Sequence, residues 1–234
     1  MLPTPSEAIA VRRQAILASP VALLVPVALA LGIVGLGHDL RPLAIGVGVV
    51  GWILAYALRA PIALILQRRG DTRPVNPWLV AASGPTEELV RLAAILILGR
   101  ELDTALSIGL GWAAIECVYS VVSTLALSAL LTRDDEEAVR IRQTLPPPPG
   151  GFTPSGPWWG VWERVWASGL HLGFSAIIAA QPLLVVLTIP LHSATNLLSL
   201  QVIERFGLAR MELLGAAWAA LIIGVAAALW AGLG

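Results

Sequence analysis

The chain has 234 residues, of which 57% are hydrophobic and only 13% are charged. Its mean hydropathy is +0.80, whereas a soluble domain carries about 25% charged residues. This composition excludes an ordinary soluble protein and predicts an integral membrane protein. No basic stripe alternates with aromatic residues, so we expect no nucleic-acid partner. The single cysteine, Cys117, excludes an intramolecular disulfide framework.

Seven segments are apolar and long enough to cross a bilayer, which takes about 20 residues per helix. We expect one all-α domain over residues 1–234, a polytopic membrane helix bundle of about seven transmembrane helices, with six to eight as the range. The first segment is longer than a signal-peptide core, so we expect it to be retained. The break between the fifth and sixth segments rests on Gln181-Pro182, because proline disfavours helix continuation. The expected helices cover residues 15–37, 42–66, 77–99, 103–131, 158–180, 182–203 and 208–232.

All fifteen basic residues are arginines, and their positions predict the orientation of the chain. Two of them, Arg41 and Arg100, fall in connections on one side, whereas ten fall on the side of the N-terminus. Cytoplasmic connections carry the excess of Lys and Arg, so we expect a multi-pass protein of the plasma membrane with a cytoplasmic N-terminus. The ten are Arg12, Arg13, Arg68, Arg69, Arg73, Arg133, Arg140, Arg142, Arg205 and Arg210.

The longest connection covers residues 132–157, on the expected cytoplasmic side. It begins with four acidic residues, 134–137, and continues through four prolines and two glycines, 146–151. Such a composition buries too little apolar surface to fold alone, so we expect a flexible Pro/Gly-rich tether. A loop that gates substrate access is the alternative.

The stretch from Gly84 to Arg91 places two adjacent glutamates and an arginine inside an apolar segment. A charge at the bilayer centre costs roughly 2.5–3.5 kcal/mol, so such residues indicate a functional site. At a rise of about 1.5 Å per residue, four titratable residues fall near the middle of four different helices. We therefore expect a polar cavity at mid-membrane depth, formed by Glu88, Glu116, His171 and His192.

Helical phase predicts which of these residues share a face. Glu87 and Arg91 are four residues apart with the acid first, which favours an ion pair and leaves Glu88 without that partner. Pro85 marks either a kink in this helix or its true start. Three other pairs share a face by the same spacing rule: Trp112 with Glu116, Arg164 with His171, and His192 with Asn196.

These residue types suit hydrolysis by an activated water. A carboxylate removed from bulk water can act as a general base near neutral pH. Neighbouring His192 and Asn196 can donate hydrogen bonds to the oxyanion of an attacked amide. We see no nucleophilic serine arrangement and interpret Ser83, Ser168 and Cys117 as packing residues. No cofactor is required, although Glu116, His171 and His192 offer an alternative zinc set without the local spacing of a His-Glu-x-x-His site.

Four motifs in order resemble the CAAX-protease/PrsW superfamily of intramembrane endopeptidases, and its YhfC-like branch most closely. The resemblance covers about 80–200 and implies a glutamate-dependent protease without a covalent intermediate. By this resemblance a glutamate of the first motif activates water, and His192 and Asn196 form the oxyanion hole. The motifs are Glu87-Glu88-x-x-Arg91, Trp112-x-x-x-Glu116, His171 and His192-x-x-x-Asn196.

The chain departs from the CAAX prenyl endopeptidases at two points. Those enzymes have one more residue between the glutamates and the arginine, and they carry histidine where this chain has Glu116. Prenylated substrates are therefore not implied. The base also stays open, because the family order favours Glu87 and the helical phase favours Glu88.

The leading hypothesis is thus an endopeptidase within or at the membrane, whose partners are lipid and a membrane protein or peptide substrate. A non-catalytic scaffold or binding protein of the same fold is the second hypothesis. A proton-coupled transporter is the third, although the chain has no inverted repeat. The sequence does not determine the oligomeric state. The expected catalytic residues are Glu87, Glu88, Glu116, His171, His192 and Asn196, with Arg91, Trp112 and Arg164 in support.

Overall fold

The computed structural model describes residues 3–70, 76–144, 153 and 155–233. Every regular element in this part of the chain is helical, which confirms the all-α prediction. In chain order the helices are α1 (Pro5–Gly35), α2 (Pro42–Ala57), α3 (Ala60–Arg68), α4 (Pro77–Ala81), α5 (Ser83–Leu98), α6 (Leu102–Leu131), α7 (Glu136–Thr144), α8 (Gly156–Ala180), the 3-10 helix η1 (Pro182–Leu184), α9 (Val185–Phe206) and α10 (Leu208–Ala231).

Local sequence explains several helix ends. Thr4 and Glu7 form a capping box at the start of α1, in which each side chain accepts from the other residue's backbone amide. Gly99 and Gly207 follow α5 and α9 with φ angles of 116° and 84°, a region that favours glycine. The expected break at Gln181-Pro182 is confirmed, because α8 ends at Ala180 and η1 begins at Pro182.

Within the described residues, five helical stretches are long and apolar enough to cross a membrane: α1, α2–α3, α6, η1–α9 and α10. Their outer surfaces expose large apolar side chains such as Leu31 of α1 (70%) and Val186 of α9 (69%), as suits contact with lipid. The two remaining expected segments, 77–99 and 158–180, correspond to α4–α5 and α8. These two carry the charged residues Glu87, Glu88, Arg91, Glu163 and Arg164.

Two expected helices are interrupted. Segment 42–66 divides at Leu58 and Arg59 into α2 and α3. Segment 77–99 divides at Ala82 into the short α4 and the longer α5. Pro85 is the third residue of α5, so of the two alternatives it lies at the true start of the helix, where its missing amide hydrogen costs no internal hydrogen bond.

The connection 132–157 differs from the expected flexible tether, since its first part is helix α7. Asp135 accepts a hydrogen bond from the amide of Ala138 at 3.1 Å and so caps this helix. Ala138 is fully buried, and Arg142 donates to the carbonyl of Leu131 at the end of α6. The proline and glycine run at 145–152 lies outside the described residues, as does Arg73.

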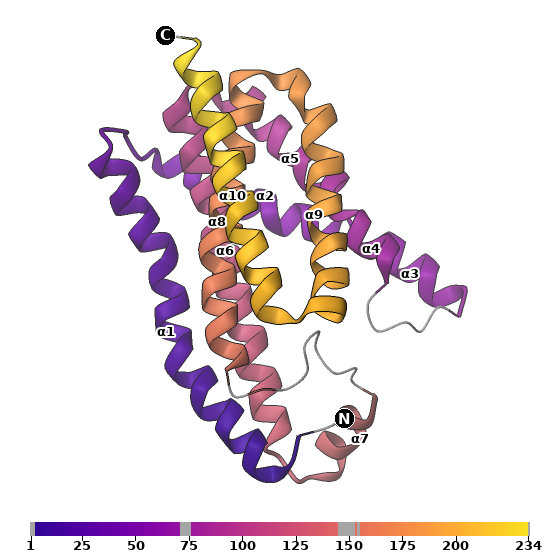
Figure 1. Ribbon diagram of the computed structural model, residues 1–234. Helices are drawn as coiled ribbons and strands as arrows, with labels where there is room; N and C mark the ends of the chain where they lie inside the picture. Colours follow the sequence, from indigo (N-terminus) through magenta and orange to yellow (C-terminus); the bar gives the residue numbers. More distant parts are fainter. Residues whose placement is uncertain (1–2, 71–75, 145–152, 154, 234) are drawn as a thin grey trace.

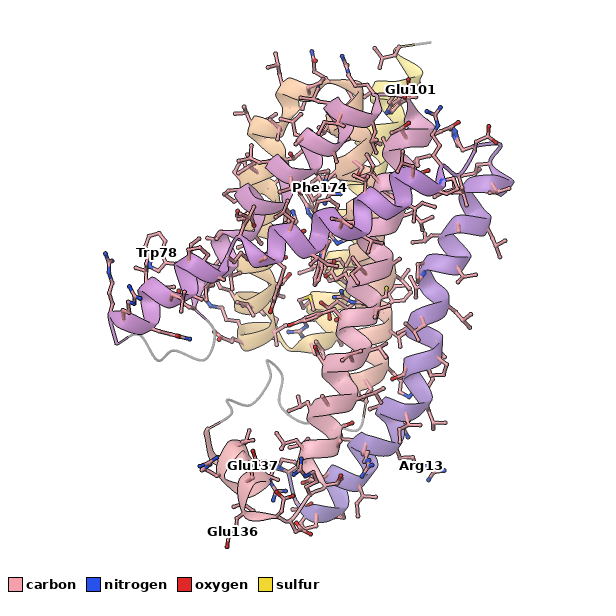
Figure 2. The ribbon with its side chains drawn as sticks, turned by 180° about the vertical axis from the view of Figure 1, so that it is seen from behind. Arg13, Trp78, Glu101, Glu136, Glu137 and Phe174 are labelled. Atoms are coloured by element: carbon pink, nitrogen blue, oxygen red, sulfur yellow. The ribbon has the colours of Figure 1, made fainter. Side chains whose placement is uncertain are left out.

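Helices α6 and α8 form the centre of the bundle, with α10 and α1 packed against α8 and with α1 and α2 packed against α6. In Figure 1, α1, α6, α8, α9 and α10 run alongside one another, while α2 crosses them and leads to α3 at the side. Figure 2 shows Phe174 within the bundle and the charged residues Arg13, Glu136 and Glu137 at one end. This arrangement places the start of α5 and the middle of α8 close to α9 and α6.

Candidate active site

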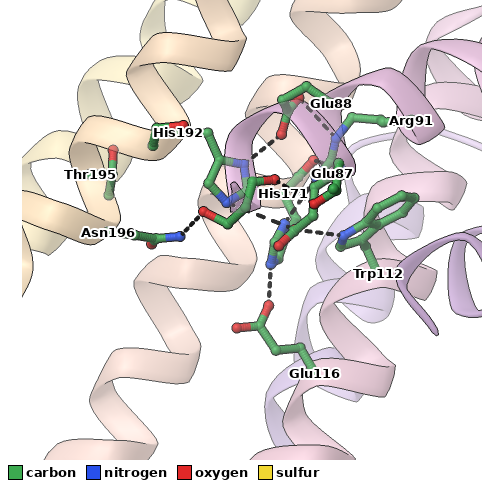
Figure 3. Close-up of polar contacts among 12 residues, drawn as sticks. Glu87, Glu88, Arg91, Trp112, Glu116, His171, His192, Thr195 and Asn196 are labelled. Carbon is green, nitrogen blue, oxygen red and sulfur yellow. Dashed lines mark hydrogen bonds and ion pairs between the residues drawn. The ribbon is translucent and has the colours of Figure 1, made fainter. Parts of the chain in front are cut away.

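The two adjacent glutamates of α5 face different partners. Glu88 is fully buried, and its Oε1 accepts a hydrogen bond from His192 Nδ1 of α9 at 2.6 Å. Its Oε2 accepts from Arg91 Nε at 3.2 Å. Both oxygens are thus occupied by cationic or N–H donors, which makes Glu88 an orienting residue for the imidazole of His192 (Figure 3).

Glu87 has a second, separate set of partners. Its Oε2 accepts from Trp112 Nε1 of α6 at 3.0 Å, and its Oε1 accepts from Arg59 Nη2 at the break between α2 and α3. The same Oε2 lies 3.8 Å from His192 Nε2, beyond a direct hydrogen bond. One imidazole therefore lies between the two glutamates.

The expected pairing of Glu87 with Arg91 is wrong. Arg91 pairs with Glu88, three residues before it, and Glu87 pairs with Arg59. Spacings of three and four both place side chains on one helix face, so tertiary contacts decide between them. Arg91 points toward α8, where it donates to further acceptors. Arg59 was missed as a site residue; its signal was a charge within an otherwise apolar segment.

Arg91 is fully buried and ties α5 to α8. Its Nη1 donates to the carbonyl of His171 at 3.1 Å and to Ser175 Oγ at 2.8 Å. The guanidinium carbon lies 4.4 Å from the ring centroid of Trp112, in a cation–π arrangement. These contacts use the planar fork of arginine in a way that lysine does not reproduce.

Arg91 also fixes the tautomer of His171. Its Nη2 lies 3.1 Å from His171 Nδ1, and a guanidinium only donates. Nδ1 is therefore the acceptor, and Nε2 carries the proton that it donates to Glu116 Oε2. His171 is held as a neutral imidazole between a cation and a carboxylate.

Glu116 joins this network from α6. Its Oε1 accepts from Arg164 Nη1 at 2.7 Å, and Arg164 Nη2 donates to Glu163 at 2.7 Å. Trp112 and Glu116 share one face of α6, as the spacing predicted, although they contact different residues: Glu87 for the tryptophan and His171 for the glutamate.

His192 and Asn196 also share one face of α9. The His192 ring stacks on Phe174, with 5.7 Å between ring centroids. Asn196 Nδ2 donates to Ser83 Oγ at 2.8 Å, and Ser83 in turn donates to the carbonyl of Val80. The side-chain amide nitrogen of asparagine carries two hydrogens, so this contact uses only one of the two donors of Asn196.

A cavity of about 380 Å³ adjoins these residues. Glu88 and Arg91 are not part of its lining. Tyr56 and Tyr119, which form a hydrogen bond of 3.0 Å with each other, contribute to another part of the lining. Five of the six expected catalytic residues line the cavity, namely Glu87, Glu116, His171, His192 and Asn196.

The alternative zinc set does not fit this arrangement. No group of three His, Cys, Asp or Glu side chains in the described part of the chain converges as metal ligands. Both nitrogens of His171 are engaged, one by Arg91 and the other by Glu116. Nδ1 of His192 is engaged by Glu88. Metal binding would have to break these contacts.

Comparison of the chain with protein-family models, with curated proteins and with solved structures finds no match. The arrangement of the site therefore carries the functional argument.

Proposed function

We propose that the protein is a membrane-embedded endopeptidase in which Glu87 activates a water molecule. The supporting observation is the pair formed by Glu87 Oε2 and His192 Nε2, which lie 3.8 Å apart on the lining of one cavity. Two atoms at this separation can both contact a single water at hydrogen-bonding distance. Of the two candidate bases, Glu87 is favoured because Glu88 lies outside the cavity lining.

In this mechanism Glu87 accepts a proton from the water as its oxygen attacks the carbonyl carbon of the peptide bond. The free N–H of Asn196 and the Nε2–H of protonated His192 stabilise the oxyanion that forms. The C–N bond then breaks, and the leaving nitrogen receives the proton from Glu87. Glu88 holds His192 by its Nδ1–H, so that Nε2 faces the cavity.

Glu116 and His171 supply a second acid–base pair on the same cavity lining. Arg164 pairs with this carboxylate and holds it in place. On our proposal the pair orients the peptide amide. The contacts of Trp112 and Arg91 position Glu87 and His171 respectively.

We further propose seven membrane crossings, in which α4–α5 and α8 join the five apolar stretches. The N-terminus is then cytoplasmic in the plasma membrane and the C-terminus external. In support, the start of α1 and helix α7, which carry Arg12, Arg13, Arg140 and Arg142, lie toward one end of the bundle, and α10 ends at the other (Figure 1). The substrate is a membrane protein or peptide, and the motif series supports a place in the CAAX-protease/PrsW superfamily.

The test is a proteolysis assay with purified protein and a panel of transmembrane and prenylated peptides. Glu87→Gln keeps the shape of the side chain and removes the base, so we expect a loss of roughly 10²–10⁴-fold in cleavage at an unchanged melting temperature. Glu101→Gln, at an exposed glutamate, is the matched control. Cleavage that survives in a folded Glu87→Gln protein would exclude this glutamate as the base.

A scaffold is the second candidate function, and one observation favours it. Arg91 is fully buried and bonds both Glu88 and α8, an arrangement that can serve to hold helices together. If the protein is a scaffold, wild type cleaves none of the peptides, and changes at Glu87 and His192 lower its stability. Melting temperature and cleavage measured on the same samples separate the two functions.

A further inference from the structure

A second cavity, of about 890 Å³, adjoins the candidate active site. The two cavities share seven residues in their linings: Tyr56, Arg59, Ser120, Thr124, Glu163, Trp166 and Asn196. Much of the larger cavity is lined by apolar side chains, among them Leu200 of α9. A substrate bound at Glu87 therefore has room to extend into a mainly apolar space.

Glu212 of α10 is the unusual residue of this second cavity. Its side chain is fully buried, and its Oε2 accepts a hydrogen bond from Trp166 Nε1 at 2.7 Å. Its Oε1 has no hydrogen-bond partner among the residues that the structure describes. A buried carboxylate oxygen without a partner is costly and rare in proteins. A ligand in the cavity that donates to Oε1 would remove that cost.

The charges around the cavity indicate the sign of the ligand. Within the described residues of the lining, the charged ones are Arg59, Glu163 and Glu212. Arg59 is paired with Glu87, and Glu163 is paired with Arg164. Glu212 is left with only a neutral indole donor, so the cavity presents one uncompensated acid to a ligand.

We propose that this cavity binds a basic side chain of the peptide substrate, whose ammonium or guanidinium group donates to Glu212 Oε1. Lysine and arginine carry an apolar stem that fits apolar surface, with the charge at its end. A hydrogen bond between two charged groups is stronger than one between neutral groups. A lipid headgroup fits less well, because its phosphate finds no unpaired arginine among the described lining residues.

This inference rests on the proposed function, because it identifies the ligand as the peptide substrate. Its test, however, measures binding and not cleavage. The probes are two heptapeptides of alanine and leucine, one with a central arginine and one with citrulline, its uncharged isostere. Their affinities are measured by fluorescence anisotropy for Glu87→Gln protein in detergent, with and without Glu212→Gln. Glu204→Gln, an exposed glutamate of α9, is the matched control.

We expect the arginine peptide to bind roughly tenfold or more tightly than the citrulline peptide. Glu212→Gln should abolish this preference, and Glu204→Gln should preserve it. Equal binding of the two peptides to protein with Glu212 intact overturns the inference, as does a preference that survives in Glu212→Gln. If Glu212→Gln fails to fold, the peptide pair still decides the question on protein with Glu212 intact. A failed cleavage assay with an intact preference would overturn only the proposed protease.

Discussion

Arg91 donates hydrogen bonds to both the ring nitrogen Nδ1 and the backbone carbonyl of His171, so one side chain of α5 fixes the position and the tautomer of a histidine on α8. The proton on His171 Nε2 consequently points at Glu116. This chain of contacts connects the glutamate pair of α5 to the glutamate of α6 through two residues.

Replacing Arg91 should destabilise the protein strongly. Arg91→Met leaves Glu88 buried beside His192 without its cation, and breaking a buried ion pair in this way costs about 3–5 kcal/mol. Arg91→Lys should keep only part of the stability that Arg91→Met loses, because lysine lacks the planar guanidinium group. Chemical unfolding in mixed detergent micelles measures the change. Arg13→Met, at an exposed arginine of α1, is the control, and equal stability of Arg91→Met and wild type would contradict the expectation.

Arg59 should affect activity more than stability. It is the cation paired with Glu87, yet its side chain is one-fifth exposed, so water can partly replace it in the fold. We expect Arg59→Met to lower cleavage by roughly 10²-fold, since a misplaced catalytic group costs about this much. The assay compares it with Arg205→Met, at an exposed arginine of α9. Unchanged turnover in a folded Arg59→Met protein would show that Glu87 needs no such partner.

Gly48 should be essential to the crossing of α2 and α6. A Cβ atom at this position would lie 2.2 Å from the carbonyl oxygen of Ile108. Because this oxygen belongs to the backbone of α6, the clash cannot be relieved by a change of side-chain rotamer. Gly48→Ala should therefore lower the free energy of unfolding by about 1–3 kcal/mol. Gly46→Ala on the same helix is a matched control, because nothing lies within 4 Å of its added Cβ. Similar melting temperatures for the two variants would mean that the helices can separate at little cost.

The stability of α7 should depend on pH through Asp135. Hydrogen bonds from Arg133 and from the Ala138 amide lower the pKa of this carboxyl below its usual value. A lowered pKa in the folded state means that the stabilisation is complete above the usual value of about 3.9 and is lost as the pH falls through the lowered pKa. Amide exchange of α7, corrected for intrinsic rates, should therefore keep its protection from pH 7 to about 4 and lose it at lower pH.

The same exchange measurement tests the cap directly. Asp135→Ala should reduce the protection of α7 at pH 7, because the amide of Ala138 loses its acceptor. Asp134→Ala is the comparison, since that side chain is 99% exposed. Equal protection in the two variants would show that packing against α6, rather than the cap, holds this helix.

The sequence by itself determined the class of protein, most helix positions and most of the polar residues that meet. The length of the apolar segments and the small number of charged residues predict a membrane helix bundle, because both are what the bilayer requires of a chain that crosses it. The spacing within each helix correctly paired Trp112 with Glu116 and His192 with Asn196 on their faces. It also separated Glu87 from Glu88, because successive residues on a helix point about 100° apart.

Only the tertiary structure decided which partner each charge takes. Helical spacing allows Arg91 to meet either Glu87 or Glu88, and the acceptors on α8 select Glu88. Arg59 reaches Glu87 from another helix, at a sequence separation of 28 residues, and no local pattern encodes that contact. Glu212 likewise meets Trp166 only because α10 packs on α8. Proximity in the folded bundle determines which partner a buried charge takes, because few donors and acceptors lie near it. A buried charge that is left unpaired is costly.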